Sequence, residues 1–281
     1  MSITASMVKE LRERTGLGMM DCKNALVEAD GDMELAIDNL RKSSGMKAAK
    51  KAGRIASDGL LAIRVGDDRG IMVEVNCETD FAARDDNFTA FVKTVADRVF
   101  DSKESDVKAL TDLDKRREEL VQKIGENISI RRVEVYDTPG VHSYIHTTGK
   151  IGVLLSMEGG NPELGKDIAM HIAATAQTTV VNPGDVSEDI VAKEREIYAA
   201  QAEDSGKPPE IVEKMIDGRI RKYLAEISLT EQAFVKDPDT KVGALLKKEK
   251  AVVTRFVRYD VGEGIEKEEE DFAAEVARQL S

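Results

Sequence analysis

Histidine and cysteine are the residues of this chain best suited to metal binding or nucleophilic catalysis, and both are scarce. His142 and His146 are four positions apart, so a β-strand would place both on one face. A zinc site would need a third ligand and supporting hydrogen bonds. His171 lies among Ile168 and Ile172 on the apolar side of an expected helix. We therefore expect these histidines to be surface and core residues rather than metal ligands.

The two cysteines, Cys22 and Cys77, are far apart in sequence and have apolar neighbours. A disulfide is one alternative, but two buried thiols in a reducing cytoplasm are the simpler interpretation. Cys77 could also be a nucleophile paired with a distant histidine, although no activating cluster of positive charge surrounds it. The sequence contains no GxxxxGK[ST], GxSxG or HExxH motif. We expect no catalytic residue, no cofactor and no bound metal.

A further candidate is the stretch NCETDFAAR, Asn76–Arg84. It follows an apolar run, Ile71–Val75, that is typical of a strand. Thr79 and Asp80 then end the strand and are followed at once by Phe81, in a chain that has few aromatic residues. The structural interpretation is that Thr79 and Asp80 cap the next segment and that Phe81 belongs to the core.

Composition restricts the classes of function. The 281 residues are 41% hydrophobic and 33% charged, as expected of a globular protein, and the formal net charge is −12. That charge repels phosphate backbones and favours a partner with basic patches. No apolar run approaches the length of a membrane span, and residues 1–6 lack the features of a secretory signal. We expect a cytoplasmic protein with no direct nucleic-acid or membrane partner.

Residues 1–42 predict a module of three short helices. Thr4 can cap the first helix and Gly16 can end it, and the second begins near Met19. Asp32 can cap the third. The following segment, 43–56, is part of a basic stretch from Arg41 to Arg54 that predicts either a solvated helical linker or a patch for nucleic acid or an acidic partner.

The rest of the chain contains a faint repeat. Residues 57–140 predict a hairpin, two helices and a closing strand, and residues 141–186 with 228–261 predict the same order again. Small antiparallel sheets covered by helices give an α+β fold with a two-subdomain core. The insertion at 187–227 predicts a helical-hairpin arm that could contact another chain. Residues 262–281 end in an amphipathic helix that either packs on its own domain or docks on a partner.

Two long motifs resemble signatures of the bacterial elongation factor Ts family. They are LRERTGLGMMDCKNAL at residues 11–26 and EVNCETDF at residues 74–81. The resemblance continues through SGKP at 205–208, EISLT at 226–230 and VGEGIEK at 261–267, in order along the chain. It implies a guanine-nucleotide exchange factor for elongation factor Tu, not an enzyme. It also implies a ubiquitin-associated-like N-terminal domain, a coiled-coil arm and a C-terminal module.

The resemblance also implies which residues act. Those near the partner's nucleotide, where they would displace Mg²⁺, are Asp80, Phe81, Ala82 and Ala83. Those that contact the partner elsewhere are Arg12, Met19, Met20, Lys23, Thr79, His146, Phe272 and Val276. Valine is usual in the family where this chain has Ala82. In this interpretation Phe81 is an apolar wedge that enters the GTPase.

Other functions remain open from the residues alone. A chaperone or scaffold could bind through the N-terminal module and the arm without releasing nucleotide. An RNA-binding factor could use the basic stretch, and its binding would depend steeply on salt. The arm could also support a dimer or a two-to-two assembly with the GTPase.

Overall fold

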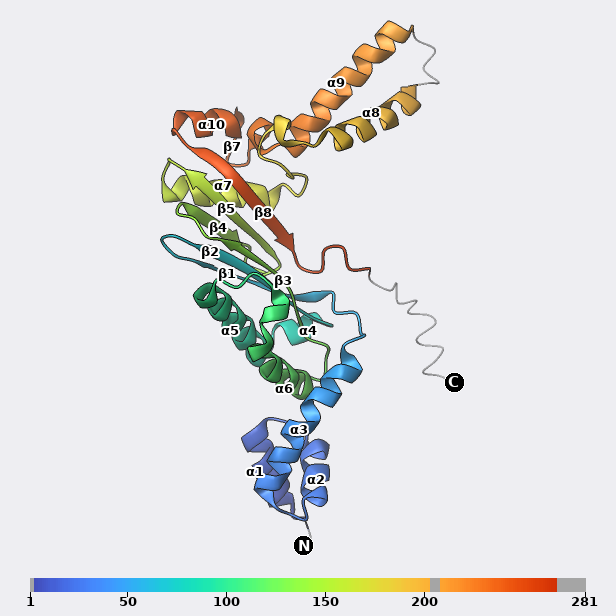
Figure 1. Cartoon of the computed structure of the whole chain (residues 1–281), viewed down its shortest axis with the longest axis vertical. Helices are drawn as coiled ribbons and strands as arrows, with labels where there is room; N and C mark the ends of the chain where they lie inside the picture. The colour runs from blue at the N-terminus through green and yellow to red at the C-terminus, as the bar shows by residue number, and fades with distance from the viewer. Residues whose placement is uncertain (1–2, 203–207, 267–281) are drawn as a thin grey trace. The chain divides into compact units, whose positions relative to one another are not determined.

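The computed structural model describes residues 3–202 and 208–266 and has an α+β architecture (Figure 1). Among these residues, no helix is both long and apolar enough to span a bilayer. The chain divides into two compact units. One consists of the chain up to Ala62, Val73–Val133 and the chain from Asp260, and the other of Ile63–Met72 and Glu134–Tyr259.

Three helices form the N-terminal module as predicted: α1 (Ala5–Thr15), α2 (Met19–Glu28) and α3 (Met33–Lys51). The Thr4 hydroxyl accepts the Met7 N–H at 3.3 Å, and the Asp32 carboxylate accepts the Leu35 N–H at 3.0 Å. Gly16 ends α1 with a φ of 69°, a conformation that glycine adopts at little cost. The core of the module includes Leu11 and Leu26, both fully buried.

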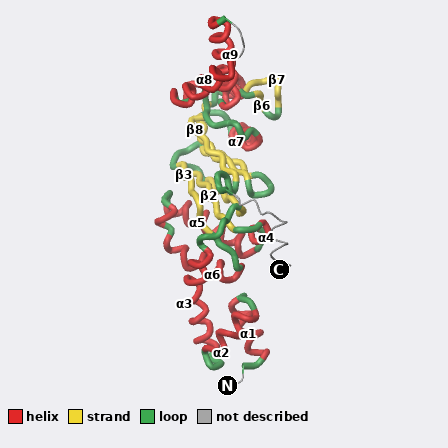
Figure 2. Tube along the Cα trace, turned by 90° about the vertical axis from the view of Figure 1, so that its right-hand side faces the viewer, coloured by secondary structure: helices red, strands yellow, loops and turns green. Residues whose placement is uncertain are grey.

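The third helix is longer than the sequence predicts. It continues from Met33 to Lys51, past the expected module boundary at residue 42, and Figure 2 shows it as one unbroken helix. Ser44 and Ala48 are buried in the added turns, where α3 packs against α6 (Asp114–Ile124). The basic stretch is therefore helical, as expected, but it is packed on one side rather than fully solvated.

The first half of the core contains a three-stranded sheet in the order β1-β2-β3. Its strands are β1 (Asp58–Val65), β2 (Gly70–Cys77) and β3 (Ser129–Tyr136). After β2 the chain forms α4 (Asp80–Ala83), α5 (Asp86–Ser102), two short 3₁₀ turns (Val107–Ala109 and Thr111–Leu113) and α6. The apolar face of α5 is buried, including Phe88 and Val95, as its periodicity predicts.

The second half repeats this arrangement with the sheet order β4-β5-β8. Its strands are β4 (Val141–Ile145), β5 (Ile151–Glu158) and β8 (Val252–Asp260). In the antiparallel pair, Val141 faces Ser156 and Ile145 faces Gly152. Helix α7 (Pro162–Ala174) packs on β4 and β5. The predicted internal repeat is confirmed, because a hairpin and a later strand build each sheet in the same order.

The second half contains additional elements. The sequence did not predict the short hairpin of β6 (Ala233–Phe234) and β7 (Asp237–Lys241), which precedes α10 (Val242–Lys248). The expected arm is an insertion of two helices, α8 (Glu188–Ala202) and α9 (Pro209–Ile227). They contact one another, and Arg195 of α8 binds Asp217 of α9 at 2.8 Å. The arm buries few apolar side chains, among them Ile216 and Ile220.

Candidate partner-binding site

The segment after β2 presents its aromatic residue to solvent. Thr79 caps α4, since its hydroxyl accepts the Ala82 N–H at 3.2 Å. The Phe81 side chain is 80% exposed, whereas Ala82 and Ala83 are buried. The predicted cap is confirmed, and the alternative interpretation, in which Phe81 belongs to the core, is wrong. The two alanines face the protein's own core, which holds the short helix in place and turns Phe81 outward.

A carboxylate from a distant part of the chain fixes the start of α4. Glu126 accepts the backbone N–H groups of Glu78 and Thr79, each at 3.0 Å, and the Thr79 hydroxyl at 2.6 Å. In return, the Glu78 carboxylate accepts the Asn127 N–H at 2.6 Å. Glu126 was not among the functional residues predicted from the sequence. Its signal was the pair Glu126-Asn127 directly after the helix-ending Gly125, but nothing local to that pair indicates its partner.

Asp80 lies beside Phe81 with its side chain 39% exposed. Its carboxylate pairs with Arg84, one turn later, at 2.8 Å. The negative charge is therefore held at the surface and partly compensated within the same segment. In chemical terms the site presents an apolar ring next to an oriented carboxylate on a rigid backbone.

The N-terminal residues named in the sequence analysis are also at the surface. Met19 and Met20 begin α2 and are 60% and 63% exposed, and Arg12 and Lys23 are exposed as well. Cys22, in the same helix, is fully buried. Two neighbouring exposed thioethers form an apolar, adaptable surface of the kind used in protein recognition.

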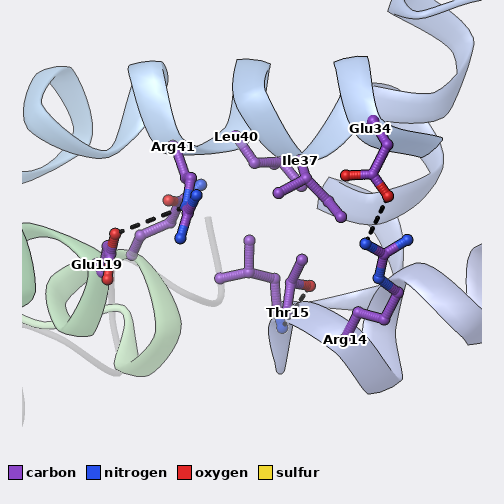
Figure 3. A pocket seen from close by; sticks show the side chains of 9 residues that line it. Arg14, Thr15, Glu34, Ile37, Leu40, Arg41 and Glu119 are labelled. Atoms are coloured by element: carbon purple, nitrogen blue, oxygen red, sulfur yellow. Dashed lines mark hydrogen bonds and ion pairs between the residues drawn. The ribbon is translucent and has the colours of Figure 1, made fainter. Parts of the chain in front are cut away.

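A cavity of about 380 Å³ is lined by residues of α1, α3 and α6 (Figure 3). Two ion pairs lie in its walls. Arg14 contacts Glu34 at 2.6 Å, and Arg41 approaches Glu119 at 4.0 Å. We assign it a structural role at the junction of α3 and α6.

The basic stretch uses several of its charges within the chain. Lys47 binds Asp21 at 2.7 Å, Arg54 pairs with Glu78 at 3.6 Å, and Lys51 donates to the Gly125 carbonyl. These contacts favour the structural interpretation of residues 41–54 over a phosphate-binding patch, because paired cations attract a nucleic acid less strongly.

His146 is exposed just after β4, next to a groove of about 330 Å³. The groove is lined in part by Tyr144, Ile151, Met170 and Arg258. The Tyr144 hydroxyl lies 3.4 Å from Nδ1 of His146. The exposed ring and the adjoining hollow could receive side chains of a second protein.

The other two histidines are structural. His142 is half-buried, and burial lowers its pKa. His171 is buried: its Nδ1 accepts the Val235 N–H at 3.2 Å, so Nε2 carries the hydrogen and donates to Oε1 of Gln232 at 2.9 Å. Burial lowers the pKa of His171, and the bond to Gln232 opposes that shift only in part. The core assignment of His171 is confirmed, and the described residues contain no cluster of potential metal ligands.

Both cysteines are buried thiols outside any disulfide, as expected. Cys77 donates to the Thr79 carbonyl at 3.2 Å, which adds to the contacts that fix the start of α4. The predicted contact residues Phe272 and Val276 lie outside the described residues, as does the SGK part of the expected turn at the tip of the arm.

Comparison with known proteins identifies the family. The model of the family described as "Elongation factor TS" matches residues 78–263. The chain is 63% identical to elongation factor Ts of Hahella chejuensis, covering 99% of each chain. It is 57% identical to that of Teredinibacter turnerae, covering 100% of this chain and 98% of the relative. These matches extend over both halves of the core, the arm and the N-terminal module, and the chain belongs to the elongation factor Ts family.

Proposed function

We propose that this chain accelerates nucleotide exchange on elongation factor Tu by inserting Phe81 beside the nucleotide site. Membership of the elongation factor Ts family makes it a translation elongation factor and a guanine-nucleotide exchange factor. Such a factor makes and breaks no covalent bond. It acts as a ligand that prefers the nucleotide-free GTPase, and by linkage it weakens nucleotide binding by the same ratio.

The observation that carries the proposal is the exposure of Phe81 on a rigid support. An aromatic side chain that is 80% exposed loses contact with water when a partner covers it. Burying a phenylalanine contributes about 1.5–3 kcal/mol. The cap on α4 and the Glu126 contacts hold the backbone that carries Phe81 in position before binding, so little backbone entropy is lost on association.

The proposed mechanism follows from how a GTPase holds its nucleotide. Backbone N–H groups of a phosphate loop, a lysine and Mg²⁺ bind the phosphates of GDP. A rigid ring can enter between the partner's helices only if they move, and that movement disturbs the shell around Mg²⁺. Asp80 places a carboxylate at the same position. GDP then dissociates and GTP can bind. Ala82 and Ala83 contribute by anchoring α4 rather than by direct contact.

The free energy gained by burying Phe81 is too small to account for nucleotide release, so the factor needs additional contacts with the GTPase. A thousandfold weakening of nucleotide corresponds to about 4 kcal/mol, of which Phe81 can supply roughly half. The rest must come from other surfaces, and the exposed candidates are Arg12, Met19, Met20, Lys23, Thr79 and His146. The C-terminal residues Phe272 and Val276 would add a further contact. A net charge of −12 favours a partner with basic patches.

The experiment is release of fluorescent GDP from elongation factor Tu in the presence of the wild-type chain or Phe81→Ala. We expect the variant to stimulate GDP release at least about tenfold less than wild type, because the phenyl ring is no longer buried in the partner. Val252→Ala, which truncates another exposed apolar side chain, is the control and should retain full activity. Equal stimulation by Phe81→Ala and wild type would rule out the wedge. A scaffold would leave bound GDP in place even with the wild-type chain.

Two further elements of the proposal concern assembly and location. The arm exposes Ile190, Ile197 and Ile211, which makes it the candidate surface for a dimer or a two-to-two assembly. A translation factor works where ribosomes are, so we place the protein in the cytoplasm, without a membrane or direct nucleic-acid partner.

A further inference from the structure

Glu74 is a charged residue in the middle of a completely buried strand. All eight residues of β2 are buried, and Glu74 has no exposed surface. A buried carboxylate without partners is strongly unfavourable, so such a residue has to be compensated by several donors. The identity of those donors indicates what the residue does.

The Glu74 carboxylate accepts hydrogen bonds from residues of β2 and β3 and from Gly262, which follows β8. Oε1 accepts hydrogen bonds from the Gly262 N–H at 2.9 Å, from Nη1 of Arg131 at 3.0 Å and from Nδ2 of Asn76 at 3.1 Å. Oε2 accepts Nε of Arg132. Burial acts to raise the pKa of Glu74, but the Gly262 N–H and the two guanidinium groups together outweigh it and hold the pKa below its usual value. The group is therefore an anion inside the protein.

The same two arginines also bind residues 260–264, here called the C-terminal segment. Arg132 donates to the Asp260 carbonyl at 3.0 Å and lies 3.4 Å from the Glu263 carboxylate. Arg131 donates to the Glu263 carbonyl. Each guanidinium group thus joins Glu74 to the segment.

Gly262 allows the close approach that these contacts require. Its φ is 77°, and an added Cβ would lie 2.1 Å from the Ser57 carbonyl oxygen. Any other residue would push the segment away from the sheet and from Glu74. The glycine and the buried carboxylate together specify one position for the backbone at this point.

Two proposed binding elements begin at this network. Strand β2 leads through Cys77 and Thr79 into α4 and Phe81, and the C-terminal segment leads to the residues that include Phe272 and Val276. We infer that Glu74 is a positioning residue that anchors the C-terminal segment to the strand carrying Phe81, so that both elements reach the GTPase from one rigid frame. This inference rests on the proposed function, because it assigns the C-terminal residues to the same partner.

A purely structural role for Glu74 leads to a different expected result in the double variant. If it only stabilised the sheet, its replacement would weaken the whole unit and would add to any change in the segment. If it acts through the segment, then releasing the segment from either side should have the same consequence, and two releases should not add.

The test uses the full chain with Glu74→Gln, Gly262→Ala and the double variant. Glutamine removes the charge and turns an N–H donor toward a guanidinium group, and alanine displaces the segment from Ser57. By hydrogen exchange, amides of residues 260–265 should exchange at least about tenfold faster in each variant, while α5 keeps its protection. Asp112→Asn, which removes an exposed ion pair with Arg98 in the same unit, is the control and should leave the segment protected.

Binding to nucleotide-free elongation factor Tu provides the second measurement. Each single variant should bind about tenfold more weakly, and the double variant should also bind about tenfold more weakly rather than a hundredfold. A hundredfold loss in the double variant, unchanged exchange in the segment, or unchanged partner affinity would overturn the inference. If Glu74→Gln does not fold, Arg131→Gln breaks the same link from a partly exposed residue.

The proposed function and the positioning role of Glu74 can fail separately. If the wild-type chain does not accelerate GDP release, the proposed function is wrong, and hydrogen exchange still decides whether Glu74 anchors the segment. If wild type is active and the segment is released without any loss of binding, the function stands and the positioning role of Glu74 is wrong.

Discussion

The second strand of the first core half, β2, carries a buried carboxylate, whereas the second strand of the other half, β5, is uncharged from Gly152 to Met157. Both strands occupy the centre of a three-stranded sheet with the same order. Counting back from the helix caps that follow them, Ser156 of β5 takes the place of Glu74. Ser156 is buried too, and its carbonyl accepts the Thr254 hydroxyl at 3.2 Å. The same sheet thus tolerates either a charged or a neutral residue at this buried position of its central strand.

The junctions after the two strands differ in what they expose. In the second half, Gly159 and Gly160 lead to Asn161, whose side chain accepts the Leu164 N–H at 2.9 Å and caps α7. The Leu164 side chain then packs into the core. In the first half, Thr79 caps α4 in the same way, but the apolar residue that follows, Phe81, faces solvent. A shared capping device therefore starts a core helix in one half and presents an exposed aromatic side chain in the other.

Among the described residues of 141–186 and 228–261, the buried polar residues are neutral rather than charged. His171 joins Val235 to Gln232, whose Oε1 also accepts the Thr178 hydroxyl at 2.9 Å and whose Nε2 donates to the Glu226 carbonyl at 2.6 Å. Glu226 lies in α9, so this network fixes the base of the arm. Each half thus uses a buried polar network to hold an element that the other half lacks: the C-terminal segment in the first half and the arm in the second.

The largest expected effect comes from His171→Ala, which removes the central residue of the buried neutral network with Val235 and Gln232. The change leaves a cavity and deprives the Val235 N–H of its acceptor, so we expect the free energy of unfolding of the second half to fall by about 3 kcal/mol. Urea denaturation measures it. His146→Ala, an exposed histidine of the same half, should change stability by less than about 0.5 kcal/mol. A loss below about 1 kcal/mol for His171→Ala would show that the network does not stabilise this half.

The next largest effect tests the junction of the first half. Glu126→Ala removes the acceptor of two backbone N–H groups and of the Thr79 hydroxyl, so α4 should lose its fixed position at a cost of about 1–2 kcal/mol. We expect stimulation of GDP release to fall about tenfold. The matched control is Glu158→Ala, an exposed glutamate at the equivalent junction of the second half. Full activity of Glu126→Ala would mean that Phe81 needs no support.

A smaller effect distinguishes the two centres by pH. Folding lowers the pKa of His171 and His142 below the ordinary 6.5, so the unfolded state binds protons more strongly than the folded state. The neutral histidines therefore stabilise the folded state above pH 6.5, and this stabilisation is lost as the pH falls below that value. The lowered pKa of Glu74 has the same sign, but its stabilisation is lost only below the ordinary 4.5. Between these two values the second half should weaken while the first does not.

Hydrogen exchange at pH 7.5 and 5.5, corrected for the intrinsic rate, measures this difference. Protection should fall in β4, β5 and α7 and stay constant in β2 and β3. A parallel loss in both halves would mean that groups other than the buried histidines control the acid response.

Much of the fold could be predicted because its signals are local. The caps at Thr4 and Asp32 and the helix-ending Gly16 and Gly125 are side-chain or backbone preferences that act within one turn. The repeat could be predicted because each half has the same order of periodic segments. The polar β6–β7 hairpin has no such pattern, and the additional length of α3 depends on its packing against α6.

The site could be predicted only in part. The family motif indicated Phe81, but its exposure depends on the burial of Ala82 and Ala83 and on Glu126, which is distant in sequence. Likewise, Glu74 sits within an apolar run, and its partners Arg131 and Gly262 are brought to it by the fold. Sequence patterns report neighbours along a helix or strand, and these contacts join elements far apart in the chain.

The smallest effect concerns the ion pairs of the arm. Arg195 binds Asp217 and Glu213 at the surface, and these contacts are the largest cause of its raised pKa. Exposed pairs are screened by salt, since the Debye length falls to about 3 Å at 1 M, whereas the Glu74 contacts are buried. Arg195→Ala should therefore lower amide protection in α8 and α9 at low salt and have little effect at 1 M salt. Protection around Glu74 should be the same at both concentrations. Salt sensitivity in β2 equal to that of the arm would show that water reaches the buried carboxylate, and the distinction between the charged centre and the surface pairs would then fail.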